Sequence, residues 1–164
     1  MSASQAESPN VAAVLATILQ RVPREQQPLL IALAERLAAV RYRRWADEMA
    51  KEPHRTNLLA CADREEEIAR RVEALYPGAA ELQQALRATA PELDDVNRSL
   101  FTGRSLAQQF AIQAEGERLG AATWRAFAQR APTAEARASL LSCAELEEAS
   151  AALLESLLQR GVVA

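Results

Sequence analysis

The strongest constraint on the fold of this chain is an internal repeat. The stretch 58–75, LLACADREEEIARRVEAL, recurs at 140–157 as LLSCAELEEASAALLESL. Positions 35–75 align with positions 117–157 without a gap, and more than a third of the aligned residues are identical. Similarity at a fixed offset is typical of a duplicated supersecondary unit. We therefore expect the chain to fold as two equivalent halves.

Helix-forming residues dominate the sequence, and signals for strands are absent. Proline and glycine residues divide the chain into segments of helical periodicity. The predicted helices are a short one over 11–22, long ones over 24–50, 55–76, 104–130 and 133–160, and a further short one over 79–89. The segment 90–103 is rich in turn residues, so we expect an irregular connection there.

The four long helices are predicted to form two hairpins, over 24–76 and 104–160. A crossover over 77–103 joins them, and an N-terminal segment with a short helix, 1–23, precedes them. Two tandem hairpins with one long connection are typical of an all-α four-helix bundle. Because the connection can return along the bundle, the third long helix is expected to run antiparallel to the first, with a twofold axis across the bundle.

Each half carries two glutamates in the middle of an apolar helical stripe. They are Glu35 and Glu65 in the first half and Glu117 and Glu147 in the second, with the same spacing in both halves. Around Glu65, the residues on the same helical face are Leu58, Cys61, Ala62, Ile68, Ala69 and Val72. The pattern predicts that four acids point inward and, under the twofold axis, meet at one level.

This arrangement resembles the ferritin-like superfamily, and within it the rubrerythrin-like branch of di-iron carboxylate proteins. That family has a glutamate on the first helix of each half, followed seven residues later by an aromatic residue. Glu35 with Tyr42 and Glu117 with Trp124 match this element. The resemblance covers about residues 24–160 and implies a ferritin-like four-helix bundle.

The second family element, an ExxH pair on the second helix of each half, is matched only in part. Glu65 and Glu147 correspond to its glutamate, but Ile68 and Ser150 stand where the family has histidine. The only histidine, His54, lies at a helix junction. The resemblance therefore implies metal ligation by four glutamates without imidazole: Glu35, Glu65, Glu117 and Glu147.

Four uncompensated buried charges would be prohibitive, and three ways of neutralising them remain open. Two divalent ions would balance four ionised glutamates; all-oxygen ligation favours hard ions such as Mn²⁺, Mg²⁺ or Ca²⁺ and weakens an iron site. Alternatively, the carboxyl groups share protons, with pKa values raised by burial and by one another. The third way is pairing with arginines such as Arg36, Arg64 or Arg118, which lie one position off the glutamate stripe.

Two functions follow from these alternatives. If the centre holds two divalent ions, Fe or Mn, the resemblance implies oxidoreductase chemistry with O₂ or peroxide, with Glu65 and Glu147 bridging the ions. If it holds none, the chain is a metal-free ferritin-like scaffold that binds a small molecule or a protein. The loss of both histidines argues against ordinary ferroxidase activity, and whether the chain is an enzyme stays open.

The remaining residues near the glutamates are expected to be structural. Cys61 and Cys143 should lie about 11 Å apart along the bundle, too far for a disulfide, and pack as small buried thiols. The cluster Arg41–Arg44 is expected to be solvated. The aromatic residues expected to fill the core between the first and third long helices are Tyr42, Trp45, Trp124 and Phe127.

Composition excludes several classes of partner. A net charge of −3 and a pI near 5.4 leave no basic surface for nucleic acid. No apolar run reaches the roughly 20 residues of a membrane span, and the first thirty residues show no secretory pattern. We therefore expect a cytoplasmic protein. The apolar segment 11–22 should pack on the bundle or on a second subunit, which makes a homodimer the expected assembly.

Overall fold

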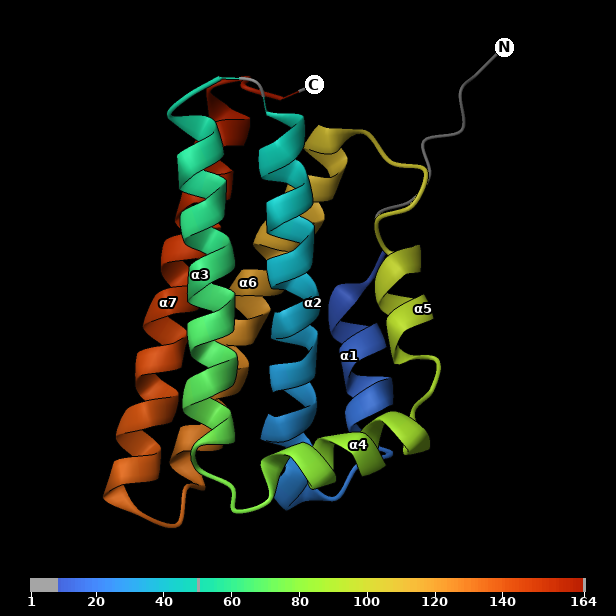
Figure 1. The fold of residues 1–164 in the computed structure, drawn as a ribbon, viewed down its shortest axis with the longest axis vertical. Helices are drawn as coiled ribbons and strands as arrows, with labels where there is room; N and C mark the ends of the chain where they lie inside the picture. The colour runs from blue at the N-terminus through green and yellow to red at the C-terminus, as the bar shows by residue number, and fades with distance from the viewer. Residues whose placement is uncertain (1–8, 50, 164) are drawn as a thin grey trace.

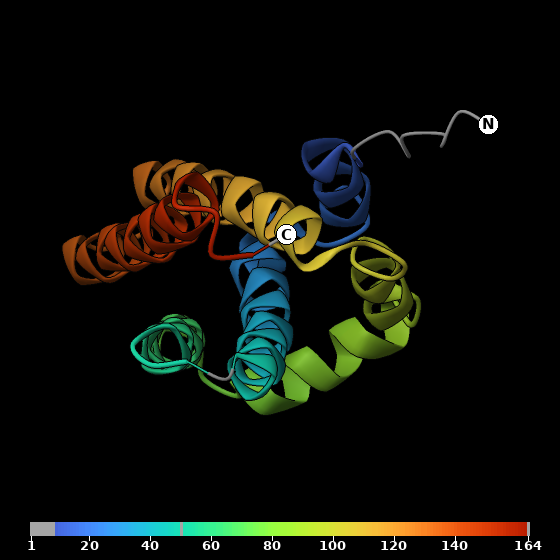
Figure 2. The ribbon, with the colours of Figure 1, turned by 90° about the horizontal axis from the view of Figure 1, so that it is seen from above.

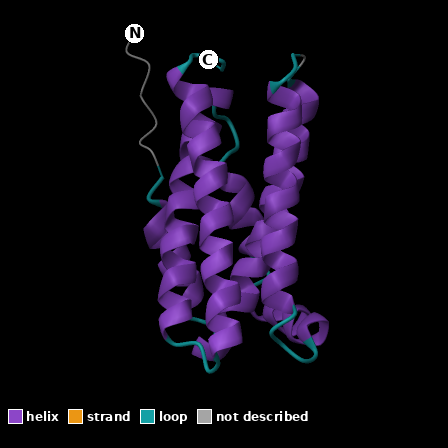
Figure 3. Cartoon of the chain, turned by 90° about the vertical axis from the view of Figure 1, so that its left-hand side faces the viewer, coloured by secondary structure: helices purple, strands orange, loops and turns teal. Residues whose placement is uncertain are grey.

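The computed structural model describes residues 9–49 and 51–163. Every regular element in these two ranges is a helix, without any strand (Figure 3), so the all-α prediction is confirmed. None of the helices there is long and apolar enough to cross a membrane. The helices are α1 (Val11–Leu19), α2 (Gln27–Glu48), α3 (His54–Glu73), α4 (Ala79–Thr89), α5 (Leu93–Ser99), α6 (Leu106–Gln129) and α7 (Ala134–Gln159), with a 3₁₀ turn, Arg24–Gln26, before α2.

The four long helices lie side by side in two antiparallel pairs, α2 with α3 and α6 with α7 (Figures 1 and 2). The pairs are joined where α3 packs against α7. In Figure 1, α4 crosses one end of α2, and α5 returns towards the other end, where α6 begins. As a result, α6 runs in the opposite direction to α2.

The starts of α6 and α7 follow from local sequence. Before α6, the Ser105 hydroxyl accepts a hydrogen bond from the Gln108 backbone N–H, and the Gln108 side chain accepts one from the Ser105 N–H. Thr133 caps α7 by accepting from the Ala136 N–H at 3.1 Å. These side chains satisfy N–H groups that the first turn leaves unpaired. They fix where the second hairpin begins.

The connection predicted to be irregular over 90–103 contains the helix α5, and that prediction was wrong. Asp94 and Asp95 were read as turn residues, but they occupy the first turn of α5, where acids interact favourably with the helix dipole. Leu93 is buried and Val96 packs on the same apolar cluster as Leu86 of α4. Burial of one face therefore outweighs the local turn propensity.

The N-terminal helix α1 packs on its own chain. It contacts α6, and Ile18 and Val22 are buried in a cluster with Leu29, Leu30 and Leu33 of α2. Packing of the segment 11–22 on the long helices, one of the two expected outcomes, is thus observed. The homodimer stays a prediction.

The internal repeat reappears in the ion pairs that join the two helices of each hairpin. Arg36 forms two parallel hydrogen bonds to Glu73, at 3.0 and 2.5 Å, and Arg118 forms two to Glu155, at 2.9 and 2.6 Å. These two pairs occupy equivalent positions in the repeat. A second equivalent set consists of Arg43 with Glu66 and Arg125 with Glu148. Because the arginines are half-exposed, the pairs contribute little stability but help to fix the register of each hairpin.

Two apolar clusters divide the interior along the length of the long helices. The first cluster includes Ala39, Tyr42, Cys61, Ala62, Phe110, Ala114 and Leu154. The second includes Ile31, Ala32, Ile68, Ala69, Ala121, Trp124, Cys143 and Ala144. On each long helix, the central glutamate stands in sequence between residues of the two clusters. The four acids therefore form a polar layer between two apolar ones.

The packing of α7 predicts a contrast between two leucines of that helix. Leu154 is fully buried in the first cluster, whereas Leu141 is 38% exposed. We expect Leu154→Ala to lower the free energy of unfolding by about 2–5 kcal/mol, and Leu141→Ala to change it by no more than about 0.5 kcal/mol. Urea denaturation measures both. Equal effects of the two substitutions would contradict this placement of α7.

Candidate metal centre

The four glutamates are buried, as their apolar stripes predicted. Glu35 lies on α2, Glu65 on α3, Glu117 on α6 and Glu147 on α7. Glu35 is 8% exposed, and the other three are at most 1% exposed. Each of the four long helices thus contributes one carboxyl group to the interior.

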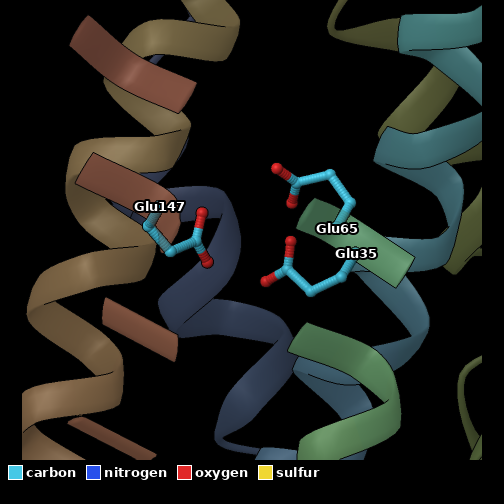
Figure 4. A group of neighbouring side chains, drawn as sticks. All are labelled: Glu35, Glu65 and Glu147. Carbon is cyan, nitrogen blue, oxygen red and sulfur yellow. The ribbon is translucent and has the colours of Figure 1, made fainter. Parts of the chain in front are cut away.

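Three of the four carboxylates converge. One oxygen each of Glu35, Glu65 and Glu147 lies within 4.8 Å of the other two, and the side chains point towards one another from α2, α3 and α7 (Figure 4). Hard cations bind carboxylate oxygens at about 2.0–2.6 Å, so two ligands of one ion lie at most about 5 Å apart. These three oxygens therefore fit around a single cation.

Glu117 is outside this three-oxygen group, and neutral donors hold one of its oxygens. Its Oε1 accepts hydrogen bonds from the Tyr42 hydroxyl at 2.6 Å and from Gln113 Nε2 at 2.7 Å. Its Oε2 is buried and has no hydrogen-bond partner. A buried acceptor without a partner is costly, so this oxygen is available to a ligand.

The donor Gln113 is itself held by an arginine. Arg41 Nε donates to Gln113 Oε1 at 2.9 Å, Arg41 Nη1 donates to Asn97 of α5 at 2.8 Å, and the guanidinium lies 3.9 Å from the Phe101 ring centroid. The expectation that the cluster Arg41–Arg44 is solvated was therefore wrong for Arg41. Its position is off the glutamate stripe, and no local pattern links it to a partner in the other half of the repeat.

Single donors also reach two glutamates of the convergent group. Trp124 Nε1 donates to Glu147 Oε1 at 2.7 Å, and the Ser150 hydroxyl donates to Glu65 Oε1 at 3.2 Å. Glu65 Oε2 is buried without a partner. Ser150 thus supports a carboxylate of the other half. The aromatic residues were expected only to fill the core, and this polar role of Trp124 and of Tyr42 was missed.

The arginines named from the sequence pair elsewhere. Arg36 and Arg118 bind Glu73 and Glu155 on the outer face, and Arg64 donates to the Cys61 thiol at 3.2 Å. Pairing of these three residues with the central acids, one of the expected alternatives, is therefore not what the structure shows. Arg41 acts on the central acids through its charge, which lowers the pKa of Glu35 against the larger rise that burial causes. One arginine cannot balance four carboxyl groups, so protons or cations must neutralise the others.

Burial governs the electrostatics of the convergent group. Removal from water, together with repulsion from Glu117, raises the pKa of Glu35 to about 7, although hydrogen bonds with Glu65 and Glu147 counteract the rise. Burial and then the neighbouring carboxylates also raise the pKa values of Glu65 and Glu147 well above the ordinary range. Without a cation, these groups therefore hold protons more tightly than exposed carboxyl groups do, and a cation must displace those protons to bind.

The cysteines behave as predicted. Cys61 and Cys143 are free, fully buried and part of different apolar clusters. Burial raises the pKa of Cys61 to about 11 and that of Cys143 to about 12, so both are thiols at neutral pH. Neither is part of the convergent oxygen group.

A glycine makes room for one of the acids. A Cβ atom at Gly120 of α6 would lie 2.6 Å from Glu147 Oε1, closer than a Cβ atom approaches a neighbouring atom. The equivalent residue in the first half is Ala38. Gly120 therefore leaves room for the Glu147 carboxylate, which an alanine such as Ala38 at this position would not.

Comparison with known proteins assigns no family. No protein-family model, curated protein or solved structure matches this chain. The ferritin-like resemblance thus rests on the glutamate and aromatic positions in the sequence and stays a prediction.

Two glycines on one face of α6 give a matched test of the carboxylate position. Gly116→Ala meets no atom within 4 Å and should stabilise the protein by about 0.5–1 kcal/mol through helix propensity. Gly120→Ala must displace the Glu147 carboxyl from its bond with Trp124, so we expect it to be less stable than Gly116→Ala by about 1 kcal/mol or more. Urea denaturation compares them, and equal stabilisation would place Glu147 elsewhere.

The raised pKa values predict the pH dependence of the metal-free protein. Glu35 has a folded pKa of about 7 against 4.5 ordinarily, so the native state binds more protons than the unfolded state between these values. The stability that this proton gives is fully present below the ordinary pKa and is lost as pH rises through about 7. Glu65 and Glu147 act with the same sign, because their pKa values are also raised, and their contribution likewise begins to be lost above the ordinary pKa.

We therefore expect the free energy of unfolding of chelator-treated protein to fall by a few kcal/mol between about pH 5 and pH 8. Urea titrations across this range measure it. Glu35→Gln is the control, because an amide does not titrate, and it should make the slope shallower without removing it, since Glu65 and Glu147 still titrate. A stability that is constant or rises with pH would contradict a layer of protonated carboxyl groups.

Proposed function

We propose that this protein binds divalent cations in a carboxylate centre between its four long helices, in a ferritin-like bundle. The observation that carries the proposal is the convergence of oxygens of Glu35, Glu65 and Glu147 within 4.8 Å in the buried interior. Burying three acids together costs free energy unless something binds there. The arrangement is therefore best explained by a ligand of positive charge.

The unpartnered oxygens support this proposal. Glu65 Oε2 is free to add to a cation held by the convergent group, and Glu117 Oε2 is free to serve a second cation. The geometry therefore favours at least one bound ion per chain. The dinuclear centre implied by the family resemblance requires Glu117 as its fourth carboxylate.

The ligand set favours hard ions. All candidate donors are carboxylate oxygens, which suit Mn²⁺, Mg²⁺ or Ca²⁺, and iron would bind more weakly without imidazole. Bound iron or manganese would supply redox chemistry with O₂ or peroxide. The chain orients the ligands, since Trp124 fixes Glu147 and Ser150 contacts Glu65, while the two apolar clusters exclude water on either side.

A metal-free scaffold is the second candidate. Oxygens of Glu35, Glu65 and Glu147 lie within 4.8 Å of one another, and a hydrogen bond between two carboxyl groups requires a proton on one of them. Such a cluster neutralises its own charge by sharing protons. The protein would then serve as a helical module that binds a small molecule or a protein.

Elemental analysis of protein purified without chelator distinguishes the two candidates. We expect about one or two divalent ions per chain in the native protein, and none in Glu65→Gln/Glu147→Gln, because an amide oxygen carries no charge to hold a hard cation. The matched control is Glu66→Gln/Glu148→Gln, which makes the same charge change one residue along α3 and α7, on side chains that pair with Arg43 and Arg125. This control should retain the metal.

Added Mn²⁺ should also stabilise the chelator-treated native protein, by about 2.7 kcal/mol at a concentration 100 times the Kd, because the unfolded chain lacks the site. The double variant should show no such shift. Absence of metal from native protein, together with a double variant that is at least as stable, would refute the metal centre and support the metal-free scaffold.

A further inference from the structure

A pocket of about 390 Å³ lies at the end of the bundle where α3 and α6 end and α2 and α7 begin. This end of the bundle is at the bottom of Figure 1. Much of the wall is apolar, since Phe127 and Leu140, which are buried, line the pocket beside Leu75. Among the described residues that line it, none is a central glutamate. The pocket is therefore separate from the proposed metal centre.

The internal repeat shows how this space arises. Because α6 runs in the opposite direction to α2, equivalent residues of the two halves lie at opposite ends of the bundle. At the end away from the pocket, Phe110 and Trp45 are fully buried in the first apolar cluster. Their counterparts at the pocket are Pro28 and Phe127, which are smaller side chains. The loss of bulk at these two positions leaves room at one end of the bundle that is filled at the other.

Two arginines line the pocket, Arg24 and Arg130. Arg130 stands where the first half has Glu48, and its guanidinium lies 5.6 Å from the centroid of the Phe127 ring. Within residues 9–49 and 51–163, neither Arg24 nor Arg130 forms an ion pair. Both guanidinium groups are therefore available to a ligand.

One acid also lines the pocket, Glu25. The backbone carbonyl of Glu25 accepts a hydrogen bond from the Tyr76 hydroxyl at 2.7 Å, which holds the Tyr76 ring in the pocket wall. The charged residues of the lining thus have an excess of one positive charge, although the chain as a whole carries a net charge of −3. A ligand with one negative charge would balance this excess.

The size and shape of the pocket suit a small aromatic molecule. Its volume lies within the range of about 300–1,000 Å³ that is typical of small-molecule sites. An apolar cavity of about 150 Å³ accommodates benzene, so 390 Å³ has room for two fused rings. The rings of Tyr76 and Phe127 can pack against such a body. A guanidinium group binds a carboxylate through two parallel N–H···O bonds, whereas a cation would be repelled by both arginines.

We infer that this pocket is a binding site for a small organic carboxylate with a flat apolar body, whose charge is balanced by Arg24 and Arg130 while its body packs against Tyr76 and Phe127. The site goes beyond the proposed metal centre, because the two share no residue. Each can therefore be tested without the other.

The test is calorimetric titration of the full-length protein with 2-naphthoate at low ionic strength, since salt screens exposed charges. The comparison probes are 2-naphthamide, which has the same shape without the charge, and 2-naphthylmethylamine, which is a cation. We expect 2-naphthoate to bind at one site per chain and at least about tenfold more tightly than the amide, because the amide cannot accept charge-assisted hydrogen bonds from arginine. The amine should not bind. Equal binding of 2-naphthoate and 2-naphthamide, or no binding of 2-naphthoate, would overturn the inference.

Matched arginine substitutions locate the charge. Arg130→Gln should weaken 2-naphthoate binding at least about fivefold and leave 2-naphthamide binding within about twofold, because only the carboxylate uses the guanidinium. Arg137→Gln makes the same charge change on an exposed arginine of α7 that does not line the pocket, and should leave both within about twofold. Equal weakening of 2-naphthoate binding by the two substitutions would reduce the effect to overall charge and overturn the inference.

A filling substitution locates the body of the ligand. Ala136 lines the pocket from the first turn of α7 and is only half-buried, so Ala136→Phe adds bulk there without disturbing the apolar clusters. It should abolish binding of both 2-naphthoate and 2-naphthamide with every charge in place. Binding of 2-naphthoate that survives Ala136→Phe would overturn the inference. Circular dichroism and a thermal melt establish that each variant is folded.

Glu65→Gln/Glu147→Gln separates this inference from the metal centre. This double variant should bind 2-naphthoate within about threefold of the native value, because neither residue lines the pocket, while it loses the metal. Arg130→Gln should do the reverse and retain the metal. Loss of 2-naphthoate binding in the double variant, with binding intact in Arg130→Gln, would show that the carboxylate binds at the metal centre and would overturn the separate pocket site.

Discussion

The structure depends on the burial of four carboxyl groups in one layer. Each long helix places one glutamate in the interior, and apolar clusters lie on both sides of the layer. Isolated charges in such a place are prohibitive, so the folded state requires protons or cations there. Neutralising these carboxyl groups therefore stabilises the folded state. A ligand that neutralises them must carry positive charge.

The two halves of the repeat keep equivalent ion pairs on their outer faces, whereas several residues around the central glutamates differ between the halves. The pairs Arg36 with Glu73 and Arg118 with Glu155 are equivalent in the two hairpins. Near the glutamates, the counterparts differ: Ile31 and Gln113, Ala38 and Gly120, Arg41 and Thr123, Tyr42 and Trp124, Ile68 and Ser150. The outer pairs fix the hairpin register, which both halves need. The inner differences give each carboxylate its own set of donors.

This asymmetry separates two kinds of carboxylate. Gln113 and Tyr42 hold Glu117 by one oxygen and leave the other free, whereas Glu35, Glu65 and Glu147 converge. Helices α1 and α5 add apolar walls to a cavity of about 130 Å³ that Glu117 lines. A duplicated set of carboxyl groups is thereby combined with a cavity on one side of the centre.

The sequence alone determined the helical class, the long helices and the inward direction of the four glutamates, because helical periodicity fixes which face each residue occupies. It also determined that Cys61 and Cys143 are buried thiols. Only the tertiary structure decided that Arg41 and Gln113 support Glu117, that residues 93–99 form a helix, and that a cavity adjoins the centre. These features depend on contacts between residues far apart in the chain, such as Arg41 and Gln113, and on space left by glycine, which no local pattern encodes.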